Sequence, residues 1–381
     1  MQFCNIIGQE EVKQRLIQSV KTGRVSHAQL FLGAEGSGAL ALAVSYAQYL
    51  LCKNRIAKDS CGTCPSCLKS SKLIHPDIHF VYPIAIKKKE TEICADVISQ
   101  WRESFLENPY LSLSDWFNHL NAENKQPVIS VEESAEILRK LALTTYEGEF
   151  KVMIIWHPEK MNVSAANKLL KILEEPSDKT LFLLVAENEE ALLRTIVSRT
   201  QLIKINRIAD EEIKNALAEK HQQTAVDAAR IAYLADGNYN AALNLIGEKQ
   251  DENFYLHQFR EWMRMCFKVD IVSAVAWVEE IANAKVGREK QKEFLSYGLN
   301  ILRECLIVMY GDKKIMRVDG EEQDFVKKLS TLLDGNMCKQ LSDELNEAIL
   351  HIERNGSGKI IFTDLSLKFM KIVSQNRTQA A

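Results

Sequence analysis

Residues 28–51 read AQLFLGAEGSGALALAVSYAQYLL: an apolar run, a glycine-rich turn and a second apolar stretch with helical spacing. A glycine loop that follows a strand and opens a helix is where a P-loop binds phosphate, because its amides and the helix N-terminus attract anions. A working P-loop ends in Gly-Lys-Ser/Thr, whose ammonium contacts phosphate and whose hydroxyl binds magnesium. The three loop glycines and the two residues that follow are Gly33, Gly36, Gly38, Ala39 and Leu40. The sequence predicts a degenerate P-loop, with an ordinary glycine turn as the alternative and weak phosphate binding by the backbone left open.

The remainder of residues 1–206 alternates helical and strand patterns. The expected helices are 10–21, 40–51, 131–143 and 164–175, and the expected strands are 28–32, 151–156 and 181–186. Ser130 followed by Glu133 has the spacing of a capping box, which marks the start of the helix at 131. Strands that alternate with helices favour a parallel sheet, so the first part is predicted to be an α/β core.

After residue 206 the strand signal ends. Helical periodicity at 210–220, 225–235 and 239–246 predicts a small helical domain at 207–248. Longer amphipathic segments near 252–268, 271–283, 288–309 and 338–353 predict an all-helical domain at 249–381. The predicted organisation is therefore an α/β domain followed by two helical domains.

Composition excludes some classes of function. The 381 residues carry a formal net charge of -3 with a pI of about 6.3. This lacks the overall basic field that supports tight, sequence-independent binding to nucleic acid. The N-terminus has no basic segment before an apolar run, and no stretch approaches eighteen consecutive apolar residues. We therefore expect a soluble, cytoplasmic protein with no membrane partner.

A tight cysteine cluster points to a metal. The four cysteines Cys52, Cys61, Cys64 and Cys67 have the spacing C-x8-C-x2-C-x2-C. Four thiolates complete a tetrahedral zinc shell and leave no position for water, so we expect a structural zinc module at 52–67. A redox role is the weaker alternative. His75 could replace one thiolate, and the other five cysteines are expected to be buried as small apolar residues.

Two further segments bear on nucleotide chemistry. In an active P-loop ATPase the strand at 151–156 would end in acidic residues that hold magnesium, but here it runs into Trp156 and His157. Neither is a suitable magnesium ligand, and His157 alone is more typical of a surface or capping histidine. Ser198-Arg199-Thr200 precedes the apolar run at 201–205, and an isolated arginine of this kind is usually only a solvated charge.

Taken together, these motifs resemble the bacterial clamp-loader AAA+ family. The segments that carry the resemblance are Ile7-Gly8-Gln9, residues 27–33 (HAQLFLG), the four cysteines, His75-Pro76-Asp77, residues 165–176 (AANKLLKILEEP) and Ser198-Arg199. The match covers residues 1 to about 246, and the C-terminal part matches mainly in length and position. Within the family the chain is similar to the delta-prime type of subunit. The family's ATPases carry an arginine after a glycine in the helical lid, where this chain has Asn240.

The resemblance implies a role in DNA replication. It implies an AAA+ core at 1–206, a lid at 207–248 and an oligomerisation collar at 249–381. It implies partnership with the gamma/tau and delta subunits of DNA polymerase III and, through the complex, with the sliding clamp and primed DNA. It also implies that Arg199, next to Ser198, acts in trans as an arginine finger on a neighbour's ATP, although Thr200 replaces the family's cysteine. We expect no ATP bound by this chain and no ATPase of its own.

Two alternatives and one insertion remain open. The chain could be an active ATPase of the gamma/tau type, which nucleotide affinity and turnover would reveal. It could instead be a zinc-containing DNA-binding module, which a strongly salt-dependent DNA affinity would reveal. Residues near 84–126, with Lys87, Lys88 and Lys89, look like an insertion whose simplest role is surface decoration, and partner binding is the alternative.

Overall fold

The chain folds into two compact units. The computed structural model describes residues 1–85, 93–122, 125–142, 144–174, 176, 179–247, 254–283, 287–312, 315–318, 320–354 and 356–379. One unit consists of Met1–Ala122 and Gln126–Ile246, and the other consists of Glu123–Lys125 and Gly247–Ala381. The lysine run at 87–89 and the end of the AANKLLKILEEP segment at Glu175 lie outside the described residues.

A five-stranded parallel sheet forms the centre of the first unit. Its strands, in spatial order, are β2 (Ile78–Val81), β5 (Lys151–Trp156), β6 (Thr180–Ala186), β1 (Ala28–Gly33) and β7 (Gln201–Ile205). Every residue of β5 and β6 is buried. Such continuous apolar runs are typical of parallel strands that helices cover on both faces.

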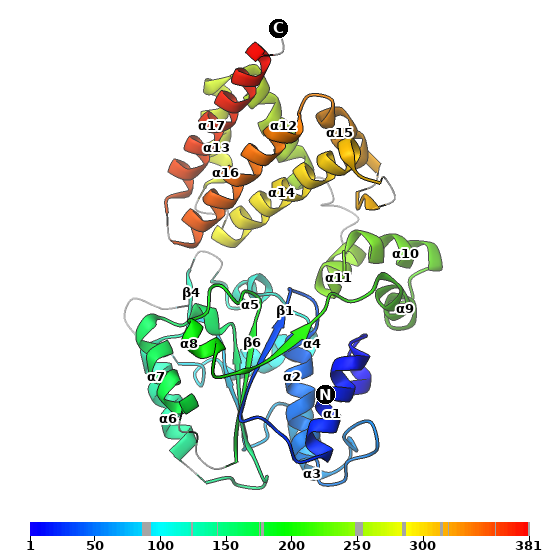
Figure 1. The fold of residues 1–381 in the computed structure, drawn as a ribbon, viewed down its shortest axis with the longest axis vertical. Helices are drawn as coiled ribbons and strands as arrows, with labels where there is room; N and C mark the ends of the chain where they lie inside the picture. Colours follow the sequence, from blue (N-terminus) through cyan, green and yellow to red (C-terminus); the bar gives the residue numbers. More distant parts are fainter. Residues whose placement is uncertain are drawn as a thin grey trace. The chain divides into compact units, whose positions relative to one another are not determined.

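Helices flank the sheet on both sides. They are α1 (Glu10–Lys21), α2 (Ala39–Leu51), α3 (Pro65–Ser71), α6 (Val131–Ala142), α7 (Val163–Glu174) and α8 (Arg194–Val197), with 3-10 turns η1 (Phe3–Asn5) and η2 (Pro158–Lys160). Figure 1 shows α1, α2 and α3 on one side of the sheet and α6 and α7 on the other. Helix α2 is buried along its whole length, which fits the almost uninterrupted apolar sequence there. This confirms the predicted α/β core with a parallel sheet and a glycine loop at the end of β1.

The insertion is a small helical subdomain on a two-stranded base. Strand β3 (Ile84–Ala85) pairs antiparallel with β4 (Pro127–Val128), so the chain leaves and returns at one place. Between them lie α4 (Ile98–Glu107) and α5 (Leu113–His119). The Trp101 ring stacks on Tyr82 at 4.2 Å and meets Trp116 edge-on at 5.3 Å, and both tryptophans are fully buried. Such aromatic burial stabilises the attachment of the insertion to the core.

Three short helices complete the first unit. Helices α9 (Asp210–His221), α10 (Ala225–Leu234) and α11 (Tyr239–Gly247) correspond to the predicted segments 210–220, 225–235 and 239–246. We call them the lid. Their hydrophobic cluster also contains Ile7 and Tyr110, which come from the N-terminus and the insertion. The lid therefore shares its core with two distant parts of the same unit.

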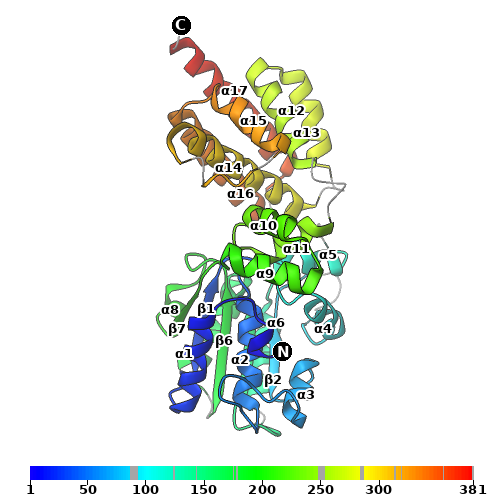
Figure 2. The same ribbon diagram turned by 90° about the vertical axis from the view of Figure 1, so that its right-hand side faces the viewer.

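The second unit is helical throughout its described residues. Its helices are α12 (Phe254–Lys268), α13 (Ile271–Ile281), α14 (Arg288–Tyr310), α15 (Gly320–Ser330), α16 (Gly335–Glu353) and α17 (Gly358–Gln379). Trp262 stacks on Trp277 at 5.4 Å and on Phe369 at 4.6 Å. These contacts join α12, α13 and α17, whose ribbons are labelled in Figure 2. None of the described helices is long and apolar enough to cross a membrane.

Candidate functional site

The glycine loop between β1 and α2 forms a tight turn. Gly36 and Gly38 adopt φ values of +67° and +85°, in the left-handed region that favours glycine. The Ser37 N–H donates to the Ala34 carbonyl at 3.1 Å, and the Gln9 side chain donates to the Ser37 carbonyl at 3.3 Å. Helix α2 then begins at Ala39, with Gly38 as its N-cap. The predicted strand, loop and helix are therefore confirmed.

Protein side chains fill the space that a nucleotide would need. The hollow that remains beside the loop is about 30 Å³ and is lined by the loop, by residues 109–111 and by the ends of β5 and β6. Sites for drug-sized ligands measure about 300–1,000 Å³. The Tyr110 ring lies against Gly38, where a Cβ would meet Cε1 at 2.9 Å, and the Asn238 side chain lies so close to Gly36 that no Cβ fits. In this conformation the loop has no room for a nucleotide.

The two residues after the loop are core residues. Ala39 and Leu40, which the sequence predicts to stand in place of the P-loop lysine and hydroxyl, are both buried. Neither side chain can contact phosphate or bind magnesium, so the loop lacks both groups.

The end of β5 carries an ion pair where an ATPase would hold magnesium. His157, at φ +51°, is buried, and its Nδ1 lies 3.1 Å from Glu159 Oε1 and its Nε2 lies 3.9 Å from Glu187 Oε1. Burial lowers the pKa of His157, but the hydrogen bond to Glu159 and the charge of Glu187 outweigh burial, so the pKa is raised. The expectation of a surface histidine is wrong, because His157 is buried. It does occupy the N-cap position of η2, but its side chain makes no capping hydrogen bond and bonds instead to Glu159.

The lid also lacks a positive charge at Asn240. This side chain is buried and accepts a hydrogen bond from Asn108 Nδ2 at 2.5 Å, while its own Nδ2 donates to Asp115 Oδ2 at 2.7 Å. Both partners belong to the insertion. The position thus holds a neutral amide whose bonds are internal to the chain.

Arg199 is exposed, and it lies just before β7, at the opposite end of the strands from the glycine loop. Gly33 at the end of β1 lies beside Ile205, and Gln29 lies beside Gln201. Arg199 lies two residues before Gln201 and six residues before Ile205, which is the register partner of Gly33. At about 3.3 Å per residue the four steps from Gln201 to Ile205 span roughly 13 Å along the strands, and Arg199 comes before Gln201. Arg199 therefore cannot serve the glycine loop of its own chain.

The arginine is held by a carboxylate that sequence reasoning did not single out. Arg199 Nη2 lies 2.5 Å from Glu174 Oε1 at the end of α7, and Arg199 Nη1 donates to the Thr195 carbonyl at 3.1 Å. The two side chains are 36% and 48% exposed. An exposed pair of this kind contributes about 0–1 kcal/mol, so the arginine can leave it at little cost. Ser198 is exposed beside it, and its hydroxyl donates to the Thr195 carbonyl.

The four predicted cysteines converge on one point. The Sγ atoms of Cys52, Cys61, Cys64 and Cys67 all lie within 4.8 Å of one another. Cys61 Sγ lies 3.6 Å from Cys52 Sγ and 3.9 Å from Cys67 Sγ. Sulfurs at about 2.3 Å from a tetrahedral zinc would be roughly 3.8 Å apart, so the cluster has the dimensions to hold such an ion. Backbone N–H groups of Thr63 and Cys64 lower the pKa of Cys61 to about 6, which favours the thiolate.

His75 and the remaining cysteines lie outside this cluster. His75 Nδ1 accepts a hydrogen bond from the Asp77 N–H at 3.1 Å. Cys94, Cys266, Cys305 and Cys338 are buried as predicted, whereas Cys4 is exposed, so that part of the expectation is wrong.

The insertion is not a surface decoration. Its loop 108–111 contacts the glycine loop through Tyr110 and the lid through Asn108, and its tryptophans are buried in the core. No sequence signal marks these contacts, because they join residues that are far apart in the sequence, such as Asn108 and Asn240 at 132 positions.

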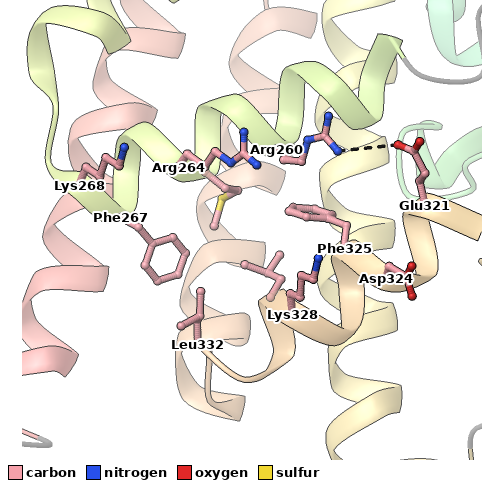
Figure 3. Close-up of a pocket in the computed structure, with 11 residues that line it drawn as sticks. Arg260, Arg264, Phe267, Lys268, Glu321, Asp324, Phe325, Lys328 and Leu332 are labelled. Atoms are coloured by element: carbon pink, nitrogen blue, oxygen red, sulfur yellow. Dashed lines mark ion pairs between the residues drawn. The ribbon is translucent and has the colours of Figure 1, made fainter.

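The helical unit contains a pocket that the sequence did not indicate. Its volume is about 560 Å³, and it lies between α12 and α15. Figure 3 shows side chains of both helices lining it, with Phe267, Phe325 and Leu332 on the apolar part and Arg260 paired with Glu321 at 3.8 Å. It holds no group from the glycine loop, the cysteine cluster or the Arg199 segment.

Comparison with known proteins identifies the family. A family model described as "DNA polymerase III, delta subunit" matches residues 8–209, more than half of the chain. The chain belongs to this family. Its relatives include the DNA polymerase III subunit delta' of Bacillus subtilis, which is 28% identical over 62% of this chain and 59% of the relative. The delta' subunit of Pseudomonas aeruginosa is 31% identical over 49% of this chain and 45% of that protein.

Related subunits of other names match as well. The DNA polymerase III subunit gamma of Buchnera aphidicola (strain APS) is 27% identical over 64% of this chain and 57% of that protein. The matched region therefore spans only about half of the length of these curated relatives. The family match, with the delta' relatives, supports a clamp-loader subunit of the delta-prime type, as the motifs predicted.

Proposed function

We propose that the chain is a non-hydrolysing delta-prime-type subunit of the DNA polymerase III clamp loader, which completes a neighbouring subunit's ATP site with Arg199. One observation carries the proposal: the glycine loop is covered by the chain's own side chains, while Arg199 is exposed just before β7, whose length of roughly 13 Å separates Gln201 from the register of the loop. The chain thus has a group to offer to a neighbour's phosphates and no room for a nucleotide of its own.

In the proposed mechanism, gamma/tau subunits bind ATP and the AAA+ domains close around primed DNA and the opened sliding clamp. Hydrolysis then releases the clamp. This chain provides a fixed surface at one end of the ring. Arg199 exchanges its bond with Glu174 for the neighbour's phosphates, which favours the ATP-bound arrangement over the others.

The proposal also gives a role to the cysteine cluster, the lid and the helical unit. The cysteine cluster binds a structural zinc ion that fastens the segment between α2 and α3. The lid is the counterpart of the family's nucleotide-sensing domain. The helical unit acts as a collar that joins this chain to the gamma/tau and delta subunits, and the assembly acts in the cytoplasm.

Substitution of Arg199 in the reconstituted complex tests the proposal. Arg199→Ala is expected to lower DNA- and clamp-stimulated ATPase at least about tenfold, because arginine fingers contribute about 10³ to 10⁵ in GTPases. Arg199→Lys should recover only part of the rate, since lysine lacks the planar fork of donors. The measurement is steady-state ATPase together with clamp loading.

Arg194→Ala is the matched control, because Arg194 is an exposed arginine on α8, five residues before Arg199. It should leave the rate unchanged. Equal ATPase for Arg199→Ala and wild type in a complex of normal composition would contradict the proposal. Micromolar ATP affinity with turnover by the isolated chain would instead identify an active ATPase, and strongly salt-dependent DNA affinity would identify a DNA-binding module.

A further inference from the structure

One aromatic side chain of the insertion joins three parts of the first unit. The Tyr110 ring lies against Gly38 of the glycine loop and meets the Tyr239 ring of the lid edge-on at 4.9 Å. Its hydroxyl accepts a hydrogen bond from the Ile7 N–H at 2.8 Å. Tyr110 is 6% exposed and belongs to the hydrophobic cluster of the lid. This residue therefore connects the loop, the lid and the N-terminal segment.

Polar contacts extend the same connection. Asn240 of the lid bonds with Asn108 and with Asp115, at 2.5 and 2.7 Å. Asp115 is itself fixed, because its Oδ2 also accepts from the N–H and hydroxyl of Ser112 at 2.8 Å each in a capping box. Asn240 is 3% exposed, so these bonds lie in a low-dielectric environment in which each is hard to replace with water.

The lid also contacts the glycine loop directly. The Tyr239 N–H donates to the Gly36 carbonyl at 3.1 Å, and Asn238 Nδ2 donates to Glu35 Oε1 at 3.1 Å. The lid and the insertion thus meet over the turn whose amides face phosphate in a working P-loop. A ligand that bridges two parts of a protein holds them in one arrangement, and here protein groups make that bridge.

We propose that Asn108, Tyr110 and Asp115 are positioning residues that hold the lid on the glycine loop in the place of a nucleotide. The arrangement of core and lid is then independent of ATP and permanently closed. This inference rests on the proposed function in one respect, namely that the chain works without binding a nucleotide. In this proposal the insertion makes the contacts between the glycine loop and the lid that a bound ATP would otherwise make.

Hydrogen exchange of the full chain tests this link. Asn240→Ala removes both bonds to the insertion, and we expect amides of the loop 33–38 and of α11 to exchange about tenfold faster than in the wild type. Amides of β6 and α7 are the internal reference and should keep their wild-type exchange rates. A general loss of stability would raise the exchange rates of these amides too. Tyr110→Phe retains the ring and loses only the acceptor for Ile7, so the loop and α11 should stay protected.

Asn118→Ala is the matched control, because Asn118 is an exposed asparagine on helix α5 of the same insertion. Its exchange pattern should equal that of the wild type. Unchanged exchange of the loop and α11 in Asn240→Ala would overturn the inference and leave the proposed function standing. The same measurement with millimolar MgATP separates the two ideas: added protection of residues 33–38 in the wild type would overturn the proposed function, and its absence supports a loop closed by the chain itself.

Discussion

His157, the residue that follows β5, forms an ion pair with a carboxylate at the end of the strand. Two carboxylates, Glu159 and Glu187, still lie near the end of the strand, but both face His157. Burial raises the pKa of Glu159, and the hydrogen bond from His157 more than reverses this, so the pKa is lowered. The Trp156 ring packs 5.1 Å from Trp101 of the insertion. These acids therefore stabilise an internal ion pair instead of presenting oxygens to magnesium.

This ion pair should make stability depend on pH. The folded-state pKa of His157 is above its unfolded value of about 6.5, so its contribution is complete below that pH and is lost as pH rises through the folded-state pKa. The lowered pKa of Glu159 sets the other limit: its contribution is present above about 4.5 and is lost as pH falls through the folded-state pKa. We expect His157→Asn, which tolerates the left-handed backbone, to lower the free energy of unfolding by about 3 kcal/mol between these limits.

Urea unfolding at a series of pH values measures this effect. The difference between wild type and His157→Asn should narrow as pH rises above the folded-state pKa of His157. His351→Gln, at an exposed position on α16, is the control and should show a small difference at every pH. A difference for His157→Asn that does not change with pH would mean that the imidazole is neutral in the folded protein.

At the scale of elements, local patterns predicted most of the fold. The predictions matched closely for the strands at 151–156 and 181–186 and for the helices at 10–21 and 239–246. A strand buried on both faces leaves a continuous apolar run, and a helix buried along one stripe leaves a period of 3.6 residues. The short strand β2 and helices α4 and α5 were missed. Their placement depends on contacts such as Asn108 with Asn240, which lie 132 residues apart, and such contacts leave no local period.

Among the features of the candidate sites, those with a local sequence pattern were predicted and those that depend on distant contacts were not. The convergence of the four cysteines was predictable because they are closely spaced in the sequence, and the glycine loop because it separates an apolar run from a helical pattern. The filling of the loop by Tyr110 and the pairing of Arg199 with Glu174 were not, since both follow from the packing of distant elements.

The segment between α2 and α3 should depend on its metal. Cys52 ends α2, and Cys64 is the N-cap of α3, so an ion at the cluster would join the two helices. We expect about one zinc ion per chain by elemental analysis, and Cys64→Ser should reduce this and lower the Tm by roughly 5 °C or more. Cys4→Ser is the control, because Cys4 is exposed and outside the cluster. Full zinc content in Cys64→Ser would show that the thiol is not a ligand.

For the whole molecule, the proposed function requires a surface that keeps this chain in the complex. The helical unit exposes apolar side chains along α13 and α17: Val272 is 82% exposed, and Ile271, Val275 and Leu367 are each about half exposed. Ile271, Val275 and Leu367 line the shallow junction of the two helices, and Val272 follows Ile271 on α13. Exposed apolar groups that gather on one surface mark contact sites more often than scattered ones do. The proposed assembly with the gamma/tau and delta subunits is therefore expected to use this surface.

A charge placed on this surface should weaken assembly without unfolding the chain. Val272→Glu combined with Leu367→Glu is expected to reduce co-purification with the gamma/tau and delta subunits at least about tenfold, because a carboxylate buried at a contact without a partner costs several kcal/mol. Val226→Glu is the matched control, since Val226 is 79% exposed on α10 of the lid. Circular dichroism of each variant checks that the helices persist. If the double variant assembles at wild-type levels while retaining its fold, the subunit contact lies elsewhere on the chain, and the pocket between α12 and α15 becomes the next surface to substitute.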